Sequence, residues 1–139
     1  MKTLAMIMAL SMMAPAAFAK TEQRDLRGDI KWLFCISMYQ PPATERVFGQ
    51  KQKPSDIMSL KVTTLDSEGQ WQTNVLPVTQ MTEIPSVTTA NYSNLVVKAA
   101  NGTVTADLFV GDMGEAKLSI NGVPQDYLKM GCTYNTFSN

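Results

Sequence analysis

The sequence predicts an all-β fold, a small antiparallel β-barrel or β-sandwich of about seven to eight strands. Three observations predict it. Short runs alternate between apolar and polar residues, as half-buried strands do. Turn-forming pairs such as Asn-Gly separate several of these runs. Two cysteines, Cys35 and Cys132, lie near the start and the end of the region that follows the N-terminal leader, which favours a fold closed by one disulfide bond.

Residues 1–19 have the layout of a secretory signal peptide. Lys2 gives a basic start, an apolar run follows from Leu4 to Met13, and Ala-Phe-Ala precedes residue 20 as a cleavage site of small residues. The apolar run is too short to span a bilayer. A buried N-terminal helix is the alternative. We therefore expect cleavage after Ala19, a periplasmic or secreted protein without membrane insertion, and a single all-β domain over residues 20–139.

The two cysteines are predicted to form the disulfide bond Cys35–Cys132, because thiols of exported proteins are usually oxidised in pairs. The chain has no histidine, so a cysteine nucleophile would lack its usual base. Two thiolates are also too few for a structural zinc site. Two free buried thiols are the remaining alternative. A disulfide requires that the first and last strands approach within about 6 Å, measured between Cα atoms.

The first expected strand covers residues 30–39 and is apolar on both faces, which favours a central position. Before it, residues 21–29 are the one candidate for a helical turn. After it, residues 40–56 are predicted to be a loop with room for one short strand. Residues 77–94 are predicted to be a long connection with one more strand near 78–84.

Three hairpins are predicted. Residues 60–75 are expected to turn within Asp-Ser-Glu-Gly, with Leu60 opposite Val75 on one face. Residues 95–110 are expected to turn at Asn101-Gly102 as a type I′ turn, with Leu95 opposite Leu108.

The third hairpin, residues 115–132, is expected to turn at Asn121-Gly122. A simple two-residue turn would send Met130 and Cys132 to the face opposite Leu118. Because Pro124 cannot donate to a ladder, we expect a bulge there that resets the alternation.

Two loops are candidate partner-binding surfaces. Residues 45–53 carry Arg46, Lys51 and Lys53, and as one basic tip they would suit an acidic protein or an anionic envelope polymer. Residues 86–94 carry Asn91 and Tyr92 among small polar residues, a composition typical of adaptable contact surfaces. The alternatives are ordinary solvated charges in the first loop and a Tyr92 that packs onto the sheet in the second.

Composition argues against several classes of function. Without histidine, the usual catalytic triads and histidine-ligated metal sites are excluded. No carboxylate pair stands at a recognisable glycosidase spacing, and no glycine-rich phosphate loop is present. The 12 basic and 12 acidic residues form no patch typical of nucleic-acid binding. We therefore expect no enzyme activity, no cofactor and no metal.

Two binding hypotheses remain. The first is an exported non-catalytic protein that presents loops from a disulfide-closed β scaffold to a protein or cell-envelope partner, as inhibitors, immunity proteins and assembly factors do. The second is a carrier that holds a small apolar ligand inside a lipocalin-like barrel. The large side chains of residues 30–39 favour the second hypothesis, and the shortness of the domain favours the first.

The layout with Cys35 and Cys132 resembles that of the periplasmic inhibitors of c-type lysozyme, which are small exported β-barrels with a cysteine in the first strand and another in the last. Their inhibitory loop carries Ser-Gly-x-x-Tyr. Here Thr-Thr-Ala-Asn-Tyr-Ser, residues 88–93, offers Tyr92 in a comparable place without the glycine. The resemblance implies a barrel fold and gives an example of the first hypothesis.

Overall fold

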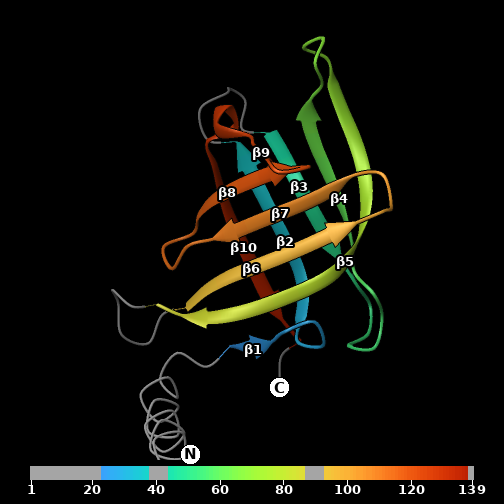
Figure 1. The fold of residues 1–139 in the computed structure, drawn as a ribbon. Coiled ribbons are helices and arrows are strands. Elements are labelled where there is room, and N and C mark those ends of the chain that lie inside the picture. The colour runs from blue at the N-terminus through green and yellow to red at the C-terminus, as the bar shows by residue number, and fades with distance from the viewer. Residues whose placement is uncertain (1–22, 38–43, 87–92, 138–139) are drawn as a thin grey trace, which may run out of the picture.

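The computed structural model describes residues 23–37, 44–86 and 93–137. Eight strands form a closed antiparallel β-barrel, and two short strands are added to it (Figure 1). Within the described residues the one helical element is a 3-10 turn. The elements are β1 (Arg24–Asp25), β2 (Ile30–Ser37), β3 (Thr44–Gln50), β4 (Ser59–Leu65), β5 (Trp71–Pro85), β6 (Ser93–Ala100), β7 (Thr105–Val110), β8 (Glu115–Ile120), β9 (Val123–Pro124), η2 (Asp126–Leu128) and β10 (Met130–Thr136).

The barrel closes through the order β5-β4-β3-β2-β10-β8-β7-β6, with β6 pairing back onto β5. Strand β5 closes the barrel because its 15 residues are enough to pair with two neighbouring strands. Its first half pairs with β4 and its second half with β6, and the register shifts between Val78 and Gln80. The strand curves between these halves, so that β2 and β10 cross the direction of β6, β7 and β8 (Figure 1). The predicted all-β fold is confirmed, and it is a barrel.

Alternation along β2 separates the inside of the barrel from the outside. Leu33, Cys35 and Ser37 are buried, while Phe34 and Ile36 between them are half-buried and face outward. The other strands fill the interior in the same way. The largest fully buried side chains are Leu26, Ile30, Leu33, Val47, Leu60, Val62, Leu76, Met81, Leu95, Val97, Leu108 and Leu128.

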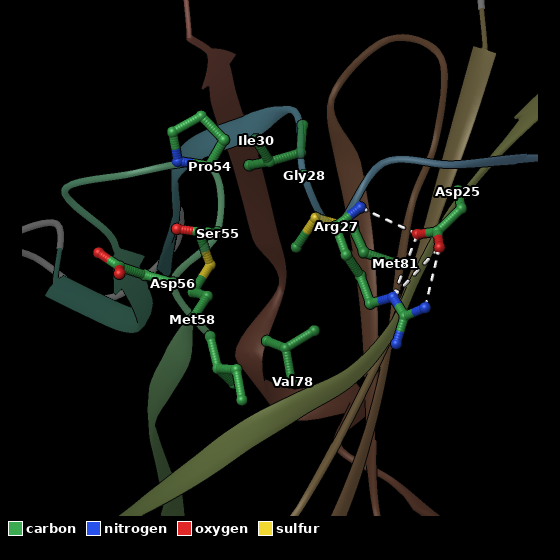
Figure 2. Close-up of a pocket in the computed structure, with 11 residues that line it drawn as sticks. Asp25, Arg27, Gly28, Ile30, Pro54, Ser55, Asp56, Met58, Val78 and Met81 are labelled. Carbon is green, nitrogen blue, oxygen red and sulfur yellow. Dashed lines mark hydrogen bonds and ion pairs between the residues drawn. The ribbon is translucent and has the colours of Figure 1, made fainter.

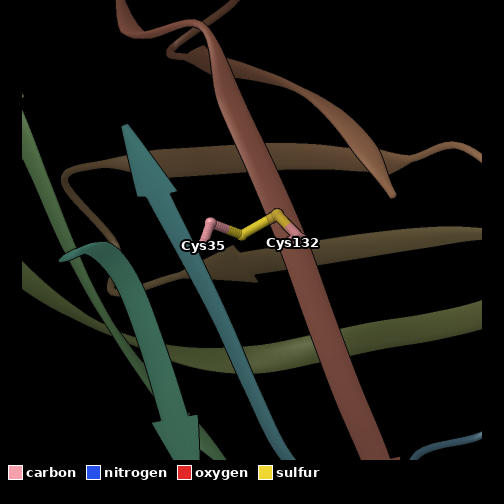
Figure 3. The surroundings of a disulfide bond; sticks show 2 residues. All are labelled: Cys35 and Cys132. Atoms are coloured by element: carbon pink, nitrogen blue, oxygen red, sulfur yellow. A yellow bond between two sulfur atoms is a disulfide. The ribbon is translucent and has the colours of Figure 1, made fainter. Parts of the chain in front are cut away.

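The predicted disulfide Cys35–Cys132 is confirmed (Figure 3). The two cysteines are direct partners of β2 and β10, and their Cα atoms lie 4.0 Å apart. Such a short separation is typical of an antiparallel pair that exchanges no backbone hydrogen bonds. The bond joins the first and last strands of the barrel across 97 residues. A buried disulfide is compatible with an oxidising compartment.

The predicted register of the first hairpin, β4–β5, is wrong by one residue. Leu60 lies opposite Leu76, not Val75. The turn is longer than expected, because the Asp66 N–H donates to the Gln70 carbonyl and Gly69 takes a φ of 78°. A shift of one residue exchanges the two faces of a strand. Val75 therefore points outward and is 53% exposed.

The second hairpin, β6–β7, has a wider turn than the predicted one. Ala100 and Thr105 are its last pair, and Leu95 lies opposite Val110 instead of Leu108. The carbonyl oxygen of the Asn101 side chain accepts the N–H groups of the two residues before Thr105, which stabilises the longer loop. Because the shift is two residues, the predicted inward face is still the buried one.

The third hairpin turns at Asn121-Gly122 as predicted, and both residues have positive φ. The expected bulge at Pro124 is wrong, since Pro124 pairs regularly with Ser119 in β9. The 3-10 turn η2 and Lys129, with a φ of 48°, reset the alternation instead. As a result Met130 and Cys132 point into the barrel like the core residues of β8.

Three further expectations are refined. In the described part of residues 21–29, the short strand β1 precedes one turn, in which the Leu26 carbonyl accepts the N–H groups of Asp29 and Ile30. The loop predicted at 40–56 contains the seven-residue strand β3. The short strand predicted at 78–84 is the second half of the long strand β5.

We predict that loss of the disulfide destabilises the fold strongly. In the chain-entropy treatment, a 97-residue loop is worth about 4 to 5 kcal/mol. The double variant Cys35→Ala/Cys132→Ala should therefore lower the free energy of unfolding by about 4 kcal/mol in urea titrations. A reducing agent should destabilise the wild type to the same extent and leave the double variant unchanged. Equal stability of oxidised and reduced wild type would contradict this account.

We also predict an acid-dependent contribution from the β4–β5 turn. Hydrogen bonds from the N–H groups of Gln70 and Glu68 hold the pKa of Asp66 below its usual 3.8. Since the folded-state pKa is lowered, the stabilisation exists above the usual value and is lost as the pH falls through the lowered one. In urea titrations Asp66→Ala should be less stable than the wild type at pH 6, and this difference should shrink toward about pH 2. Ser67→Ala in the same turn is the control.

Candidate functional site

The structure does not form the predicted basic tip at residues 45–53. Arg46 lies near the start of β3 and Lys51 directly follows its end, and their exposed fractions are 7% and 5%. Lys53 is exposed. The prediction of one exposed basic loop is therefore wrong, because most of the segment is a barrel strand. Asn91 and Tyr92, the second predicted contact surface, lie outside the described residues, so their role stays a prediction.

Lys51 holds two segments together at one end of the barrel. Its Nζ donates to the carbonyl of Arg27, to that of Pro54 at 3.0 Å and to that of Asp56 at 3.3 Å. The turn after β1 is thereby joined to residues 52–57. A buried ammonium group needs such acceptors to replace water. Lys51 is thus a structural cation at the edge of a pocket.

Arg46 lies at the opposite end of the barrel, at the bulge where β2 pairs with Val47 and then with Glu45. Its guanidinium carbon is 3.5 Å from the centre of the Trp71 ring, a cation–π contact. Burial lowers the pKa of Arg46. The Trp71 ring centre in turn lies 6.3 Å from that of Tyr127 in η2. These contacts attach η2 to the barrel.

The mouth pocket is a hollow of about 360 Å³ at the Lys51 end of the barrel (Figure 2). Its lining includes core side chains, namely Ile30, Met58, Val78 and Met81. Its rim carries the ion pair between Arg27 and Asp25, with 2.9 Å between Nη2 and Oδ2. The hydrogen bonds from Arg27 lower the pKa of Asp25. The pocket therefore combines an apolar interior with a charged rim.

The outer groove is a hollow of about 600 Å³ on the outside of the barrel, where β10 passes between β2 and β8. Phe34 and Ile36 line its β2 side, and Met113 and Glu115 line its β8 side. Gly131, which lies opposite Ile36, has no side chain to fill the space between them. Met113 is 86% exposed. The groove thus offers a largely apolar surface with a flexible methionine at its border.

The seam cleft adjoins the outer groove and measures about 410 Å³. It is more polar, with Glu83, Ser93 and Tyr134 in its lining. Burial raises the pKa of the Tyr134 phenol, and the Glu83 carboxylate adds to the rise. The two hollows have three residues in common, Gly114, Cys132 and Thr133. Together they follow the β8-facing edge of β10.

These hollows are hard to predict from the amino-acid sequence. Each brings together residues from strands that are far apart in the chain, such as Phe34 with Met113. One signal was present: the run Gly-Asp-Met-Gly at 111–114 places a methionine in a turn. A methionine that is exposed in such a turn indicates a contact surface.

The described residues contain neither a metal-ligating cluster nor a membrane-spanning helix. In residues 23–37, 44–86 and 93–137 no group of three potential metal-ligating side chains converges. The same ranges contain no helix of sufficient length and apolarity to cross a membrane. No protein-family model, no curated protein and no solved structure matches the chain.

We predict that Lys51 and Lys53 differ sharply when each is replaced by methionine. Lys51→Met removes the hydrogen bonds that the buried ammonium group donates to three backbone carbonyls and should lower the free energy of unfolding by about 2 kcal/mol. Lys53→Met changes an exposed side chain and should alter it by less than about 0.5 kcal/mol. Urea titrations of both variants measure the difference. Equal effects would mean that the Lys51 hydrogen bonds contribute nothing to the fold.

Proposed function

We propose that this protein is an exported, non-catalytic binding protein that holds a protein partner on the outside of a disulfide-closed barrel. The outer groove is the observation that carries the proposal. An apolar hollow of about 600 Å³ on a small protein is a surface that water solvates poorly and that a partner side chain would fill.

The neighbouring surface supports this proposal. Trp32 and Phe34 lie on the outer face of β2 with ring centres 5.5 Å apart, and Phe48 lies opposite Phe34 on β3. All three rings are half-buried. Aromatic and methionine side chains are enriched at protein interfaces, where a few of them contribute most of the binding energy. The groove thus has an aromatic surface on one side and Met113 on the other.

Two further features favour export and a binding role. The disulfide suits an oxidising compartment, and residues 1–19 have the composition of a cleaved signal peptide. The chain contains no histidine for general acid–base catalysis. An inhibitor, an immunity protein or an assembly factor would combine these features.

The test is affinity capture from an extracytoplasmic extract, followed by binding measurements with the purified partner. Ile36→Glu places a charge in the outer groove and should weaken binding at least about tenfold, because a desolvated carboxylate would replace an apolar contact. Val75→Glu is the matched control, an outward aliphatic residue three strands away on β5. A partner that binds Ile36→Glu as well as the wild type would contradict the proposal, as would the absence of any partner.

A second candidate function is the transport of a small apolar or amphipathic ligand in the mouth pocket. The specific observation is that this pocket reaches core side chains, including Met58 and Met81, from an open end of the barrel. Barrel mouths are frequent ligand sites. A volume of about 360 Å³ is near the lower limit for such sites, which is why we place this function second.

Fluorescence of an anilinonaphthalene sulfonate probe tests the second candidate. If the mouth pocket takes apolar ligands, the wild type should enhance the fluorescence with one saturable site. Val78→Trp fills the pocket and should abolish that site, whereas Val75→Trp, on the outer face, should keep it. Equal enhancement by all three proteins would exclude the mouth pocket.

A further inference from the structure

Strand β10 has an incompletely paired edge. It pairs with β2 from Met130 to Thr136, whereas on its other side it pairs with β8 only at Met130 and Gly131. The chain of β8 departs at this point, because residues 111–114 turn toward β7. Beyond Gly131 the seam cleft, not a neighbouring strand, lies beside β10.

The backbone of Tyr134 points into this cleft. The Cys132 N–H donates to the Gly114 carbonyl at 2.8 Å, so the backbone groups of Cys132 face away from β2. Backbone direction alternates along a strand, and the pairing with β2 is regular from Cys132 to Tyr134. The N–H and carbonyl of Tyr134 therefore also face away from β2. The described residues supply neither group with a backbone partner on that side.

The side chains that line this edge change from apolar at one end to acidic at the other. Near Gly131 it is apolar, through Ile36 and Met113 of the outer groove. Near Tyr134 it is acidic, with Glu83 in the seam cleft. Arg24 lies opposite Glu83 on β1, yet the ion pairs of the described residues are Arg27–Asp25 and Lys98–Asp107, and neither involves Glu83.

We propose that the partner presents an extended segment that adds as a strand to the free edge of β10, with a basic side chain at Glu83 and an apolar side chain in the outer groove. Strand addition of this kind takes affinity from main-chain hydrogen bonds and specificity from the side-chain sites beside them. Here Tyr134 supplies the main-chain groups, and the two ends of the groove supply the specificity. The inference rests on the proposed function and names the chemistry of its partner.

The direction of the added strand follows from β8. This strand runs antiparallel to β10 and leaves its edge at Glu115. A segment that continues the same line is also antiparallel, so its N-terminal part lies near Tyr134 and its C-terminal part near Met113. The basic residues of the partner segment should therefore precede its apolar residues.

Synthetic peptides test this inference with the wild-type protein. The probe is a fluorescein-labelled Lys-Thr-Lys-Val-Thr-Leu peptide, whose lysines and apolar residues lie on opposite faces of a strand as the inward Glu83 and the outward groove require; it is compared with its Glu-Thr-Glu analogue and with its reversed sequence by fluorescence anisotropy. The first peptide should bind at least about tenfold tighter than either of the others. N-methylation of successive peptide bonds should weaken binding at every second position only, because alternate N–H groups face β10.

Protein variants give a second measurement. Glu83→Gln should reduce the preference for lysine over glutamate peptides at least about threefold, while Glu68→Gln, in the exposed β4–β5 turn, should not. Tyr134→Pro removes the N–H that faces the cleft and leaves the ladder with β2 intact, whereas Tyr134→Val keeps that N–H. Binding should be lost with proline and kept with valine. If the proline variant does not fold, the N-methyl series and Glu83→Gln still decide.

The outcomes separate this inference from the proposed function. No binding of any peptide at about 1 mM, equal affinity for the lysine and glutamate peptides, or an N-methyl series without alternation would each overturn strand addition. If a captured partner still depends on Ile36 in that case, the proposed function stands and the partner binds through a folded surface. If no partner is captured, the proposed function itself fails.

Discussion

The pairing of β2 with β10, fixed by Cys35–Cys132, is the contact on which the rest of the barrel depends. It joins the first barrel strand to the last, and its two cysteines are 97 residues apart in the chain. Pairing over such a sequence separation is entropically costly. The covalent bond reduces that cost by restricting the unfolded chain. The barrel can then tolerate a weaker junction elsewhere.

That weaker junction lies one strand further along the barrel, between β10 and β8. Strand β10 is held along its whole length by β2, so its other edge need not be fully paired for the fold to persist. The turn at 111–114 and the residue Gly131 leave space at this edge, and the outer groove and the seam cleft occupy it. The covalently fixed pairing and the shortest pairing of the barrel therefore share one strand, and the candidate binding surface lies along its incompletely paired edge.

A buried cation lies at each end of the barrel, and the two cations have different kinds of partner. Lys51 meets backbone carbonyls at one end, and Arg46 meets the Trp71 ring at the other. An ammonium group accepts several carbonyl partners as a compact charge, whereas a planar guanidinium stacks on an aromatic ring. Their positive charge therefore serves the fold. The largely apolar outer groove is the stronger candidate for the binding surface.

The fold class, the disulfide and the approximate positions of the turns could be predicted from the amino-acid sequence. Alternation, Asn-Gly pairs and cysteines are local or compositional signals, and they need no knowledge of neighbouring strands. Tertiary structure alone decided the registers and the surfaces. Val75 points outward because the turn at Gly69 is one residue longer than expected, and a shift of one residue exchanges the faces of a strand. The hollows beside β10 depend on which strands become neighbours, and sequence patterns do not specify that.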